Sequence, residues 1–528
     1  MRKLPIGIQS FEKLISSNFV YVDKTEYVYR LASEESTYFL SRPRRFGKSL
    51  FLSTLKAYFE GKRELFAGLK IMELTRDNPE AWQAYPVFYF DFTGEDYSKE
   101  EALESLLDEH LRRWEELHAL DHDSMSLGER FRALLLAANR QSGLRSVVLV
   151  DEYDKPLLEV MNNPQLLERN KATFKGFFST LKGFDQYIQF TFITGVTKFT
   201  RVSPFSDLNN LNDISLEKKY ADICGITKKE LLSYFQPEIV ELAAEQSLTI
   251  DQCIKELQEC YDGYHFHPST GGVYNPFSLL KAFYAKELGS YWFATGTPTF
   301  LINKMKFSQF DVRQLTNGTL GATEAVLENY RGEDSDPIPL LYQAGYLTLA
   351  GYDRRRNLYR LIIPNREVEY GLLECLLPSY VPNPYNNKDL DIYILSDYID
   401  AGDLDGIKNV ITALFAGIPY TNNDAPFEHY FQTVIYLVFK LLGRYIQCEM
   451  YTATGRIDCT LATNDYIYLF EFKRDSTAKA ALEQIEAKQY ALPFAADKRK
   501  LYKIGVAFDS ETRLVSDWSV GEQNKPTP

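Results

Sequence analysis

The chain has 528 residues, of which 45% are hydrophobic, and a formal net charge of −13. Its length is enough for about three domains with substantial cores, and its acidic charge argues against a protein that coats nucleic acid over its whole surface. No run of about eighteen apolar residues and no apolar signal segment occur, so we expect a cytoplasmic protein with no membrane partner.

The cysteines and histidines do not form the spacing of a metal site. The six cysteines contain no C-x-x-C pair, which favours free buried thiols. His265 and His267 could ligate a metal, but without a second cluster we interpret them as ordinary strand residues.

The first informative stretch in chain order is 41–49, which reads Ser-Arg-Pro-Arg-Arg-Phe-Gly-Lys-Ser. The run 37–40 predicts a buried strand before it, and the run 50–55 predicts a helix after it. In a phosphate-binding loop in this setting, backbone N–H groups surround the phosphates, a lysine reaches the terminal phosphates and a hydroxyl ligates magnesium. We therefore expect ATP and Mg²⁺ to bind here through Arg44, Arg45, Phe46, Gly47, Lys48 and Ser49, with Ser49 as a metal ligand.

The loop departs from the usual pattern, because Arg42 stands in the position of the first glycine and Pro43 has no N–H. Taken alone, the loop could equally be a solvated basic turn before a helix. A second motif favours nucleotide binding: the apolar run 146–150 ends in Asp151 and Glu152, as expected of a central parallel strand with acids at its carboxyl end. In a P-loop ATPase the first acid orients magnesium and the second, here the catalytic residue, activates the attacking water.

Further strands are expected at 86–92 and 188–195. Helices long enough for a crossover connection are expected at 98–119 and 126–141. Thr194 would lie at a strand tip, where its hydroxyl could contact the terminal phosphate, and the alternative is a simple turn residue. Arg201 could stabilise phosphate charge within its own chain or in a neighbouring copy of the chain. The second alternative would require a homo-oligomer.

From 222 to 300 the periodicity is helical, and this part contains Tyr261-Asp262-Gly263-Tyr264. Together with Tyr21-Val22-Asp23-Lys24-Thr25, the loop and the Asp-Glu strand end, residues 1–300 resemble the bacterial AAA-ATPase-like family. The resemblance implies a nucleotide-binding P-loop module with a helical lid. It also accounts for Arg42, since the family's own loop reads Arg-Pro-Arg-Arg-Phe-Gly-Lys. Whether ATP is hydrolysed or only bound stays open.

Residues 338–349 and 358–366 have the helix-then-hairpin order of a winged-helix module. Arg354, Arg355 and Arg356 would lie at the hairpin tip. Such a module could touch DNA through these arginines. We favour the other interpretation, a connector that packs the two ends of the chain together.

The last part of the chain contains a second group of reactive residues. Its expected elements are a helix, three strands, a helix and a strand, at 427–442, 444–451, 456–463, 466–473, 477–491 and 501–507. Glu471 and Lys473 share one face of a strand because they are two positions apart, and Asp458 lies on the neighbouring strand. Two carboxylates and a lysine suit a magnesium-dependent phosphodiesterase, with Asp458 and Glu471 as metal ligands and all three as catalytic residues. The alternative is a solvated amphipathic strand, which the large apolar neighbours of Glu471 disfavour.

This group resembles the PD-(D/E)XK nuclease superfamily, and in particular the nuclease-like domain found behind this ATPase. The resemblance implies that Glu428 joins the metal ligands and that Gln484 supports the site.

The expected fold is therefore α/β, with four parts. They are a P-loop core at 1–221 built on a parallel sheet, a helical lid at 222–300, a winged-helix-like connector at 301–400 and an αβββαβ restriction-endonuclease-like domain at 401–528. The expected function is an ATP-binding ATPase coupled to a metal-dependent nuclease that acts on DNA or RNA, of which DNA is favoured, in defence or nucleic-acid processing. The alternative is a nucleotide-gated regulator or scaffold whose nuclease fold does not cut.

Overall fold

The chain forms two compact units. The N-terminal unit comprises 1–296 and 318–368, and the C-terminal unit comprises 297–317 and 369–528. The computed structural model describes residues 3–34, 36–121, 125–198, 211–293, 301–302, 304–305, 308, 310–315, 320–328, 336–380, 388–416, 427–442, 446–452, 455–512 and 514–522. The expected boundaries at 221, 300 and 400 stay predictions.

The N-terminal unit is built on a five-stranded parallel sheet with the strand order β2-β3-β4-β1-β5. Its strands are β1 (Thr37–Ser41), β2 (Val87–Asp91), β3 (Ser146–Asp151), β4 (Ile188–Gly195) and β5 (Leu211–Asp213). β3 is buried along its whole length, as its continuous apolar run predicts. β5 was not predicted, because three residues carry too little pattern. Since β4 lies between β1 and β3, its tip lies between the loop and the Asp-Glu motif.

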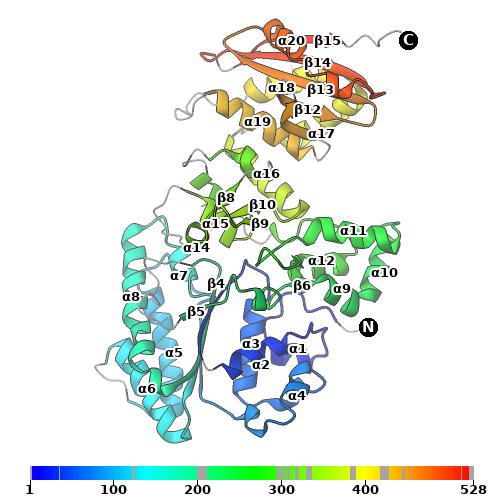
Figure 1. Cartoon of the computed structure of the whole chain (residues 1–528). Coiled ribbons are helices and arrows are strands. Elements are labelled where there is room, and N and C mark those ends of the chain that lie inside the picture. Colours follow the sequence, from blue (N-terminus) through cyan, green and yellow to red (C-terminus); the bar gives the residue numbers. More distant parts are fainter. Residues whose placement is uncertain are drawn as a thin grey trace. The chain divides into compact units, whose positions relative to one another are not determined.

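Helices cover both faces of this sheet (Figure 1). One group contains α1 (Phe11–Ser16), α2 (Thr25–Ser33), α3 (Lys48–Phe59) and α4 (Lys70–Leu74). The other contains α5 (Ala102–His118), α6 (Leu127–Ser142), α7 (Lys155–Leu158) and α8 (Pro164–Gly183). The expected crossover helices correspond to α5 and α6, and a capping box of Ser126 and Glu129 starts α6. Phe90 of β2 lies 5.3 Å from Phe131 of α6 and 5.4 Å from Phe177 of α8, measured between ring centroids, which holds these helices on the sheet.

The helical layer expected after the core is present. It consists of α9 (Lys228–Tyr234), α10 (Gln236–Glu245), α11 (Ile250–Tyr261) and α12 (Pro276–Ala285), with the two-stranded pair β6 (Ile226–Thr227) and β7 (Val273–Tyr274). Apolar residues of these helices form one core, which includes Phe235, Leu257 and Phe283. The interpretation of His265 and His267 as strand residues was wrong. They lie in a turn, where the Nδ1 atoms of the two rings contact the carbonyl of Thr270 and the hydroxyl of Ser269.

The connector has the predicted helix-then-hairpin order. It contains α14 (Glu324–Glu328), α15 (Ile338–Gln343) and a three-stranded antiparallel sheet of β8 (Gly321–Ala322), β10 (Leu358–Ile362) and β9 (Thr348–Asp353). This module belongs to the N-terminal unit.

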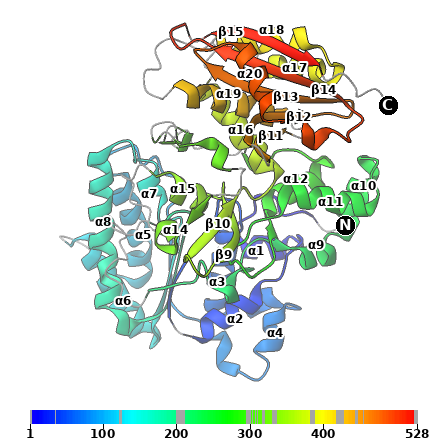
Figure 2. The ribbon, with the colours of Figure 1, turned by 45° about the horizontal axis from the view of Figure 1, so that its top comes forward.

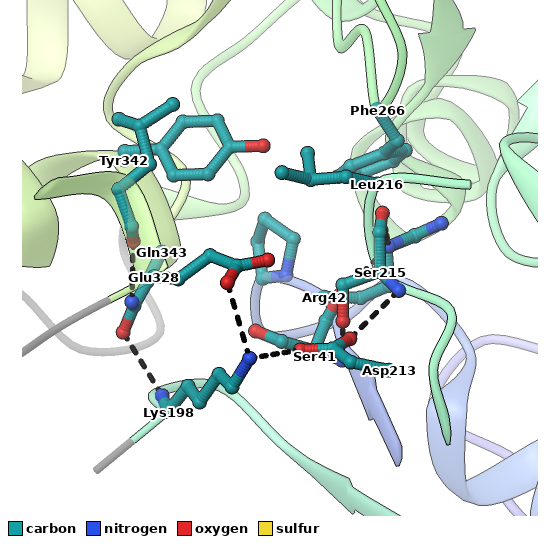
Figure 3. A pocket seen from close by; sticks show the side chains of 12 residues that line it. Ser41, Arg42, Lys198, Asp213, Ser215, Leu216, Phe266, Glu328, Tyr342 and Gln343 are labelled. Atoms are coloured by element: carbon teal, nitrogen blue, oxygen red, sulfur yellow. Dashed lines mark hydrogen bonds and ion pairs between the residues drawn. The ribbon is translucent and has the colours of Figure 1, made fainter. Parts of the chain in front are cut away.

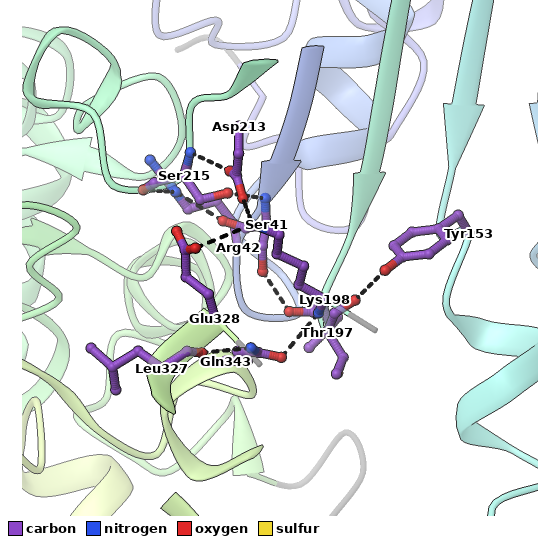
Figure 4. Close-up of polar contacts among 11 residues, drawn as sticks. Ser41, Arg42, Tyr153, Thr197, Lys198, Asp213, Ser215, Leu327, Glu328 and Gln343 are labelled. Carbon is purple, nitrogen blue, oxygen red and sulfur yellow. Dashed lines mark hydrogen bonds and ion pairs between the residues drawn. The ribbon is translucent and has the colours of Figure 1, made fainter. Parts of the chain in front are cut away.

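Lys198, just after β4, holds the connector on the sheet (Figure 4). Its Nζ lies 2.5 Å from Oδ2 of Asp213 on β5 and 3.4 Å from Oε2 of Glu328 on α14. Its backbone N–H donates to Oε1 of Gln343, whose Nε2 donates to the carbonyl of Leu327. The strand that passes between the loop and the Asp-Glu motif is therefore tied directly to the connector.

The C-terminal unit contains a five-stranded sheet with the order β11-β12-β13-β14-β15, in which only the β13–β14 pair is parallel. Its strands are β11 (Ile446–Thr452), β12 (Gly455–Ala462), β13 (Tyr466–Arg474), β14 (Lys500–Phe508) and β15 (Val515–Glu522). The helices are α16 (Arg366–Tyr380), which begins in the N-terminal unit, α17 (Lys388–Ala401), α18 (Leu404–Ala416), α19 (Phe427–Leu441) and α20 (Ala478–Ala487). Figure 2 shows α20 against the sheet, where it contacts β13, β14 and β15. The αβββαβ order is confirmed, and α17, α18 and β15 are additions to it.

No helix in the described part of the chain is both long enough and apolar enough to cross a membrane.

Replacing Lys198 by Met is expected to destabilise the N-terminal unit by about 1–3 kcal/mol, because the carboxylates of Asp213 and Glu328 would keep their charges without a cation. Urea unfolding measures this change. Lys219→Met is the matched control, since Lys219 is exposed and 3.5–3.7 Å from its carboxylates, and it should cost less than about 0.5 kcal/mol. Adding Glu328→Gln to Lys198→Met should recover part of the loss, and equal destabilisation by both lysine variants would contradict this role.

Candidate functional site

The predicted phosphate-binding loop joins β1 to α3. Gly47 caps the N-terminus of α3 with a φ of +93°, a left-handed conformation that glycine adopts without steric cost. Lys48 begins α3 and is buried, and its Nζ donates hydrogen bonds to the carbonyl oxygens of Arg42 (3.0 Å) and Pro43 (3.1 Å). The ammonium group thus bridges the start of its own loop. A phosphate oxygen could replace either carbonyl as its acceptor.

Arg42, in the position of the usual first glycine, ties the loop to the segment that follows β5 (Figure 3). Its guanidinium group donates to the carbonyls of Ser41, Ser215 and Tyr220 at 2.8, 2.8 and 3.0 Å. The same group lies 3.9 Å from the ring centre of Phe266, a cation–π contact. The side chain is 1% exposed, so Arg42 is a clamp on the loop and not a ligand contact. Sequence reasoning missed this role, although the replaced glycine was its signal.

Two of the cavities that border the loop in the described part of the chain bear on nucleotide binding. The smaller, of about 40 Å³, lies beside Arg42 and the connector residues Tyr342 and Gln343, and it is too small for a nucleotide (Figure 3). The larger has about 390 Å³, and its lining includes the predicted residues Arg44, Arg45, Gly47, Lys48, Ser49 and Glu152. Its remaining lining includes Gln9 near the N-terminus and Phe277 of α12. Neither of these two residues was among the site residues predicted from the sequence.

Asp151 ends β3 as a buried carboxylate held by hydroxyl groups. Thr194 at the end of β4 donates to its Oδ1 at 3.0 Å, and Tyr89 donates to its Oδ2 at 3.3 Å. Burial raises the pKa of Asp151, and its hydrogen bond with Ser49 acts in the opposite direction. The structure thus brings together the two expected magnesium ligands, Ser49 and Asp151. Thr194 is fully buried, and its hydroxyl group contacts this carboxylate.

Glu152 follows β3 in a left-handed conformation, with a φ of +49°. This conformation is uncommon for a residue with a side chain, and Glu152 lines the larger cavity together with Asp154. Asp154 accepts hydrogen bonds from the backbone N–H groups of Val196 (3.0 Å) and Thr197 (2.6 Å), and its burial raises its pKa to about 6. Asp154 was missed as a positioning residue, although it lies only two residues after Glu152.

The side chains of the other loop residues expected to bind the nucleotide differ in their exposure. Phe46 is 1% exposed and packs edge-on against Tyr264 and Phe266, so only its backbone can reach a ligand. Arg44 and Arg45 are exposed, and the Arg45 guanidinium lies 4.8 Å from the ring centre of Phe277. Arg201 lies outside the described residues.

The second candidate site lies on β12, β13 and α20. Asp458 Oδ2 accepts the backbone N–H of Phe472 at 2.9 Å, across the antiparallel pair. Glu471 is 2% exposed, and its Oε1 accepts hydrogen bonds from Nζ of Lys473 (3.3 Å) and from the side-chain amide of Gln484. Lys473 Nζ also donates to Oε1 of Gln484 at 2.5 Å. The predicted residues Glu471, Lys473 and Gln484 therefore form one closed network.

The carboxylate of Glu471 is only half satisfied. Its Oε2 is buried and has no hydrogen-bond partner in the described part of the chain. Burial, and after it the charge of Asp458, raise the pKa of Glu471 to about 7, although Lys473 acts in the opposite direction. A buried oxygen with a free lone pair, beside a second carboxylate, fits a hard divalent cation. Among the described residues no group of three His, Cys, Asp or Glu side chains gathers around such a position. Glu428 lies in α19, in a stretch whose side chains are outside the description.

The position of α20 depends on a close approach to β14. A Cβ atom on Gly505 would lie 2.1 Å from the carbonyl oxygen of Ala478, so only glycine allows this contact. Gly505 pairs with Glu471 across the parallel strands. The Thr477 side chain caps the start of α20 by accepting the N–H of Ala480. The glycine and the cap thus place Gln484 above Glu471 and Lys473.

A parallel sheet with a strand–loop–helix and an Asp-Glu strand end defines the N-terminal unit as a P-loop ATPase-like module, and the αβββαβ sheet with its Asp, Glu and Lys residues defines a nuclease-like domain. Residues 5–205 match the family described as predicted AAA-ATPase, and residues 426–518 match the PD-(D/E)XK nuclease superfamily. The chain is 37% identical over 526 residues to an uncharacterized protein in the vnfD 5′ region of Azotobacter chroococcum mcd 1, an alignment that covers 97% of this chain and 98% of that protein. The chain belongs to the AAA-ATPase-like family whose C-terminal domain is of the PD-(D/E)XK superfamily. The two resemblances drawn from the sequence are confirmed.

Glu471 is expected to make the metal-free protein less stable as the pH rises. Its pKa is about 7 in the folded protein against an ordinary value of 4.5, so between these values the folded protein keeps a proton that the unfolded chain has lost. The stability contributed by protonated Glu471 is complete below pH 4.5 and is lost as the pH rises through about 7. Thermal unfolding in EDTA should therefore occur about 2–4 °C lower at pH 8 than at pH 6.

Glu471→Gln is the control for this titration, because an amide does not ionise, and its unfolding temperature should change less between the two pH values. Magnesium or manganese added at pH 8 should raise the wild-type value more than that of the variant. An identical pH response of both proteins would contradict the shifted pKa.

Proposed function

We propose that this protein is an ATP-hydrolysing module coupled to a divalent-metal-dependent nuclease that acts on nucleic acid, DNA rather than RNA. The observation that carries the proposal is the buried Oε2 of Glu471, which has no hydrogen-bond partner among the described residues. Glu471 is next to Asp458 and in a network with Lys473. Without a cation, a buried carboxylate oxygen of this kind is costly. We take the protein to act in the cytoplasm, in defence or nucleic-acid processing.

In the ATPase module, Ser49 and Asp151 would hold Mg²⁺, which neutralises phosphate charge when it is bound. The hydrogen bonds to Asp151 from Thr194 and Tyr89 support this role, because they orient the carboxylate in advance. Lys48 would exchange a loop carbonyl for a phosphate oxygen. Glu152 lines the larger cavity together with Lys48 and Ser49, and it would accept the proton of the attacking water.

In the nuclease domain, Asp458 and Glu471 would hold the divalent cation, which supplies water activation and charge stabilisation when it is bound. Lys473 would orient the attacking water and offset the negative charge that develops on the phosphate. Gln484 contacts both Glu471 and Lys473, and so would keep the two side chains in one geometry.

The ATPase half is tested by phosphate release and nucleotide binding. Glu152→Gln should bind ATP as the wild type does but hydrolyse it at least about 100-fold more slowly, because the general base is lost. Lys48→Ala should weaken ATP binding itself. Lys56→Ala is the control and should change neither, because this half-exposed lysine further along α3 pairs with Glu60. If Glu152→Gln releases phosphate at the wild-type rate, the assignment of the base fails.

The nuclease half is tested by cleavage of DNA and RNA with Mg²⁺ or Mn²⁺, with and without ATP. Asp458→Ala and Lys473→Ala should each reduce cutting at least about 100-fold. Lys479→Ala on α20 is the matched control, because its side chain is 82% exposed and outside the network, and it should cut normally. Wild-type protein that cuts neither substrate under any of these conditions would favour a nucleotide-gated regulator with a non-cleaving nuclease fold.

A further inference from the structure

The sequence contains three groups of three basic residues within four positions, and in two of them the structure gives some of the side chains partners within the chain. The first belongs to the phosphate-binding loop. In the group at 498–500, Arg499 pairs with Asp497 at 2.6 Å and donates to the carbonyl of Thr463, while Lys500 lies 4.6 Å from the ring centre of Tyr502. The remaining group, at 354–356, lies at the tip of the β9–β10 hairpin in the connector.

The hairpin tip is a hydrogen-bonded turn whose arginines are exposed to solvent. Oδ1 of Asp353 accepts the backbone N–H groups of Arg355 (2.9 Å) and Arg356 (3.3 Å). Asn357 takes the left-handed conformation that closes the turn, with a φ of +55°, and its side chain accepts the Tyr352 hydroxyl. Backbone contacts therefore shape the turn without using the guanidinium groups.

These guanidinium groups are unusually free for a protein of net charge −13. Arg354 and Arg355 are exposed, and no carboxylate of the described residues pairs with either of them. Arg356 is 77% exposed and approaches Asp353 only at 4.0 Å. Arg360, on β10, is also exposed and adds a fourth positive charge to the hairpin.

Aromatic rings accompany the charges. Tyr352 is 37% exposed, and its ring centroid lies 4.7 Å from that of Tyr359 on the paired strand. Arginines that present planar donors to phosphate oxygens, next to an accessible aromatic ring, form the kind of surface that binds a nucleic-acid strand. An acidic peptide would satisfy the charges but would leave the aromatic surface without a matching base.

We infer that the hairpin tip, defined as Tyr352 with Arg354, Arg355, Arg356 and Arg360, binds the phosphate backbone of the nucleic acid on which the nuclease domain acts. The inference rests on the proposed function, because the nuclease domain of the same chain supplies the reason for a nucleic-acid partner. The contacts are to phosphate, so they increase affinity without reading sequence. This role differs from the packing connector that the sequence favoured, because the arginines of the hairpin tip are exposed to solvent.

The test measures binding of the full-length protein to a fluorescently labelled DNA duplex, and to single-stranded DNA and RNA, by anisotropy in EDTA. Arg354, Arg355 and Arg356 are replaced together by Gln, which removes the charges and leaves Asp353 and Asn357 to form the turn. The control variant Lys99→Gln, Arg113→Gln and Lys255→Gln removes the same charge from exposed positions elsewhere in the N-terminal unit. Thermal unfolding of both variants checks that they fold.

The hairpin variant should bind nucleic acid about 10- to 100-fold more weakly than the control at about 0.1 M salt. Its slope of log affinity against log salt should be smaller by about 2–3, one for each lost phosphate contact. Equal affinities and slopes for the hairpin and control variants would overturn the inference. An equal loss of binding to poly-glutamate would also overturn it, because the surface would then serve an acidic protein.

The two proposals fail in different ways. EDTA removes the metal, so binding is measured without cutting. If the wild-type protein binds nucleic acid through the hairpin tip but never cuts it, only the proposed nuclease activity is contradicted. If the wild-type protein cuts nucleic acid in Mg²⁺ and the hairpin variant binds it as tightly as the control variant does, only the inference about the hairpin tip is contradicted.

Discussion

A carboxylate buried at the end or in the middle of a strand is unfavourable unless hydroxyl groups, a cation or an ammonium group share its charge, and both sites in this chain are built around such a carboxylate. Asp151 is held by Ser49, Tyr89 and Thr194, and Glu471 by Lys473 and Gln484. In both cases burial raises the pKa of the acid. The surrounding strands and helices place those partner groups next to each carboxylate.

The two units position the partners of these carboxylates in different ways. In the N-terminal unit, parallel pairing aligns strand ends, so that β4 brings Thr194 beside Asp151 and continues to Lys198 and the connector. In the C-terminal unit, antiparallel pairing brings Asp458 next to the backbone of β13, and a helix packed on glycine supplies Gln484. The first arrangement links its site to a neighbouring module, and the second encloses its site within one sheet and one helix.

Two departures from expectation have clear physical causes. Arg42 stands where the usual pattern has a glycine, and its long side chain leaves the loop, donates to three carbonyls and lies over the Phe266 ring. His265 and His267 alternate with an aromatic residue as strand residues do, yet they lie in a turn closed by local hydrogen bonds with Thr270 and Ser269. A period of two over three residues is too short to separate a strand from a turn.

The sequence by itself determined the order of the elements and the residue types of both sites, because the relevant signals are local. Continuous apolar runs mark buried strands, Gly47-Lys48-Ser49 marks a loop before a helix, and the two-residue spacing of Glu471 and Lys473 places them on one face. Only the tertiary structure decided which oxygen atoms are satisfied, that Thr194 contacts Asp151, and that the arginines of the hairpin tip stay in solvent. Those outcomes depend on strand order, on short additions such as β5, and on contacts between residues far apart in the chain, none of which a local pattern encodes.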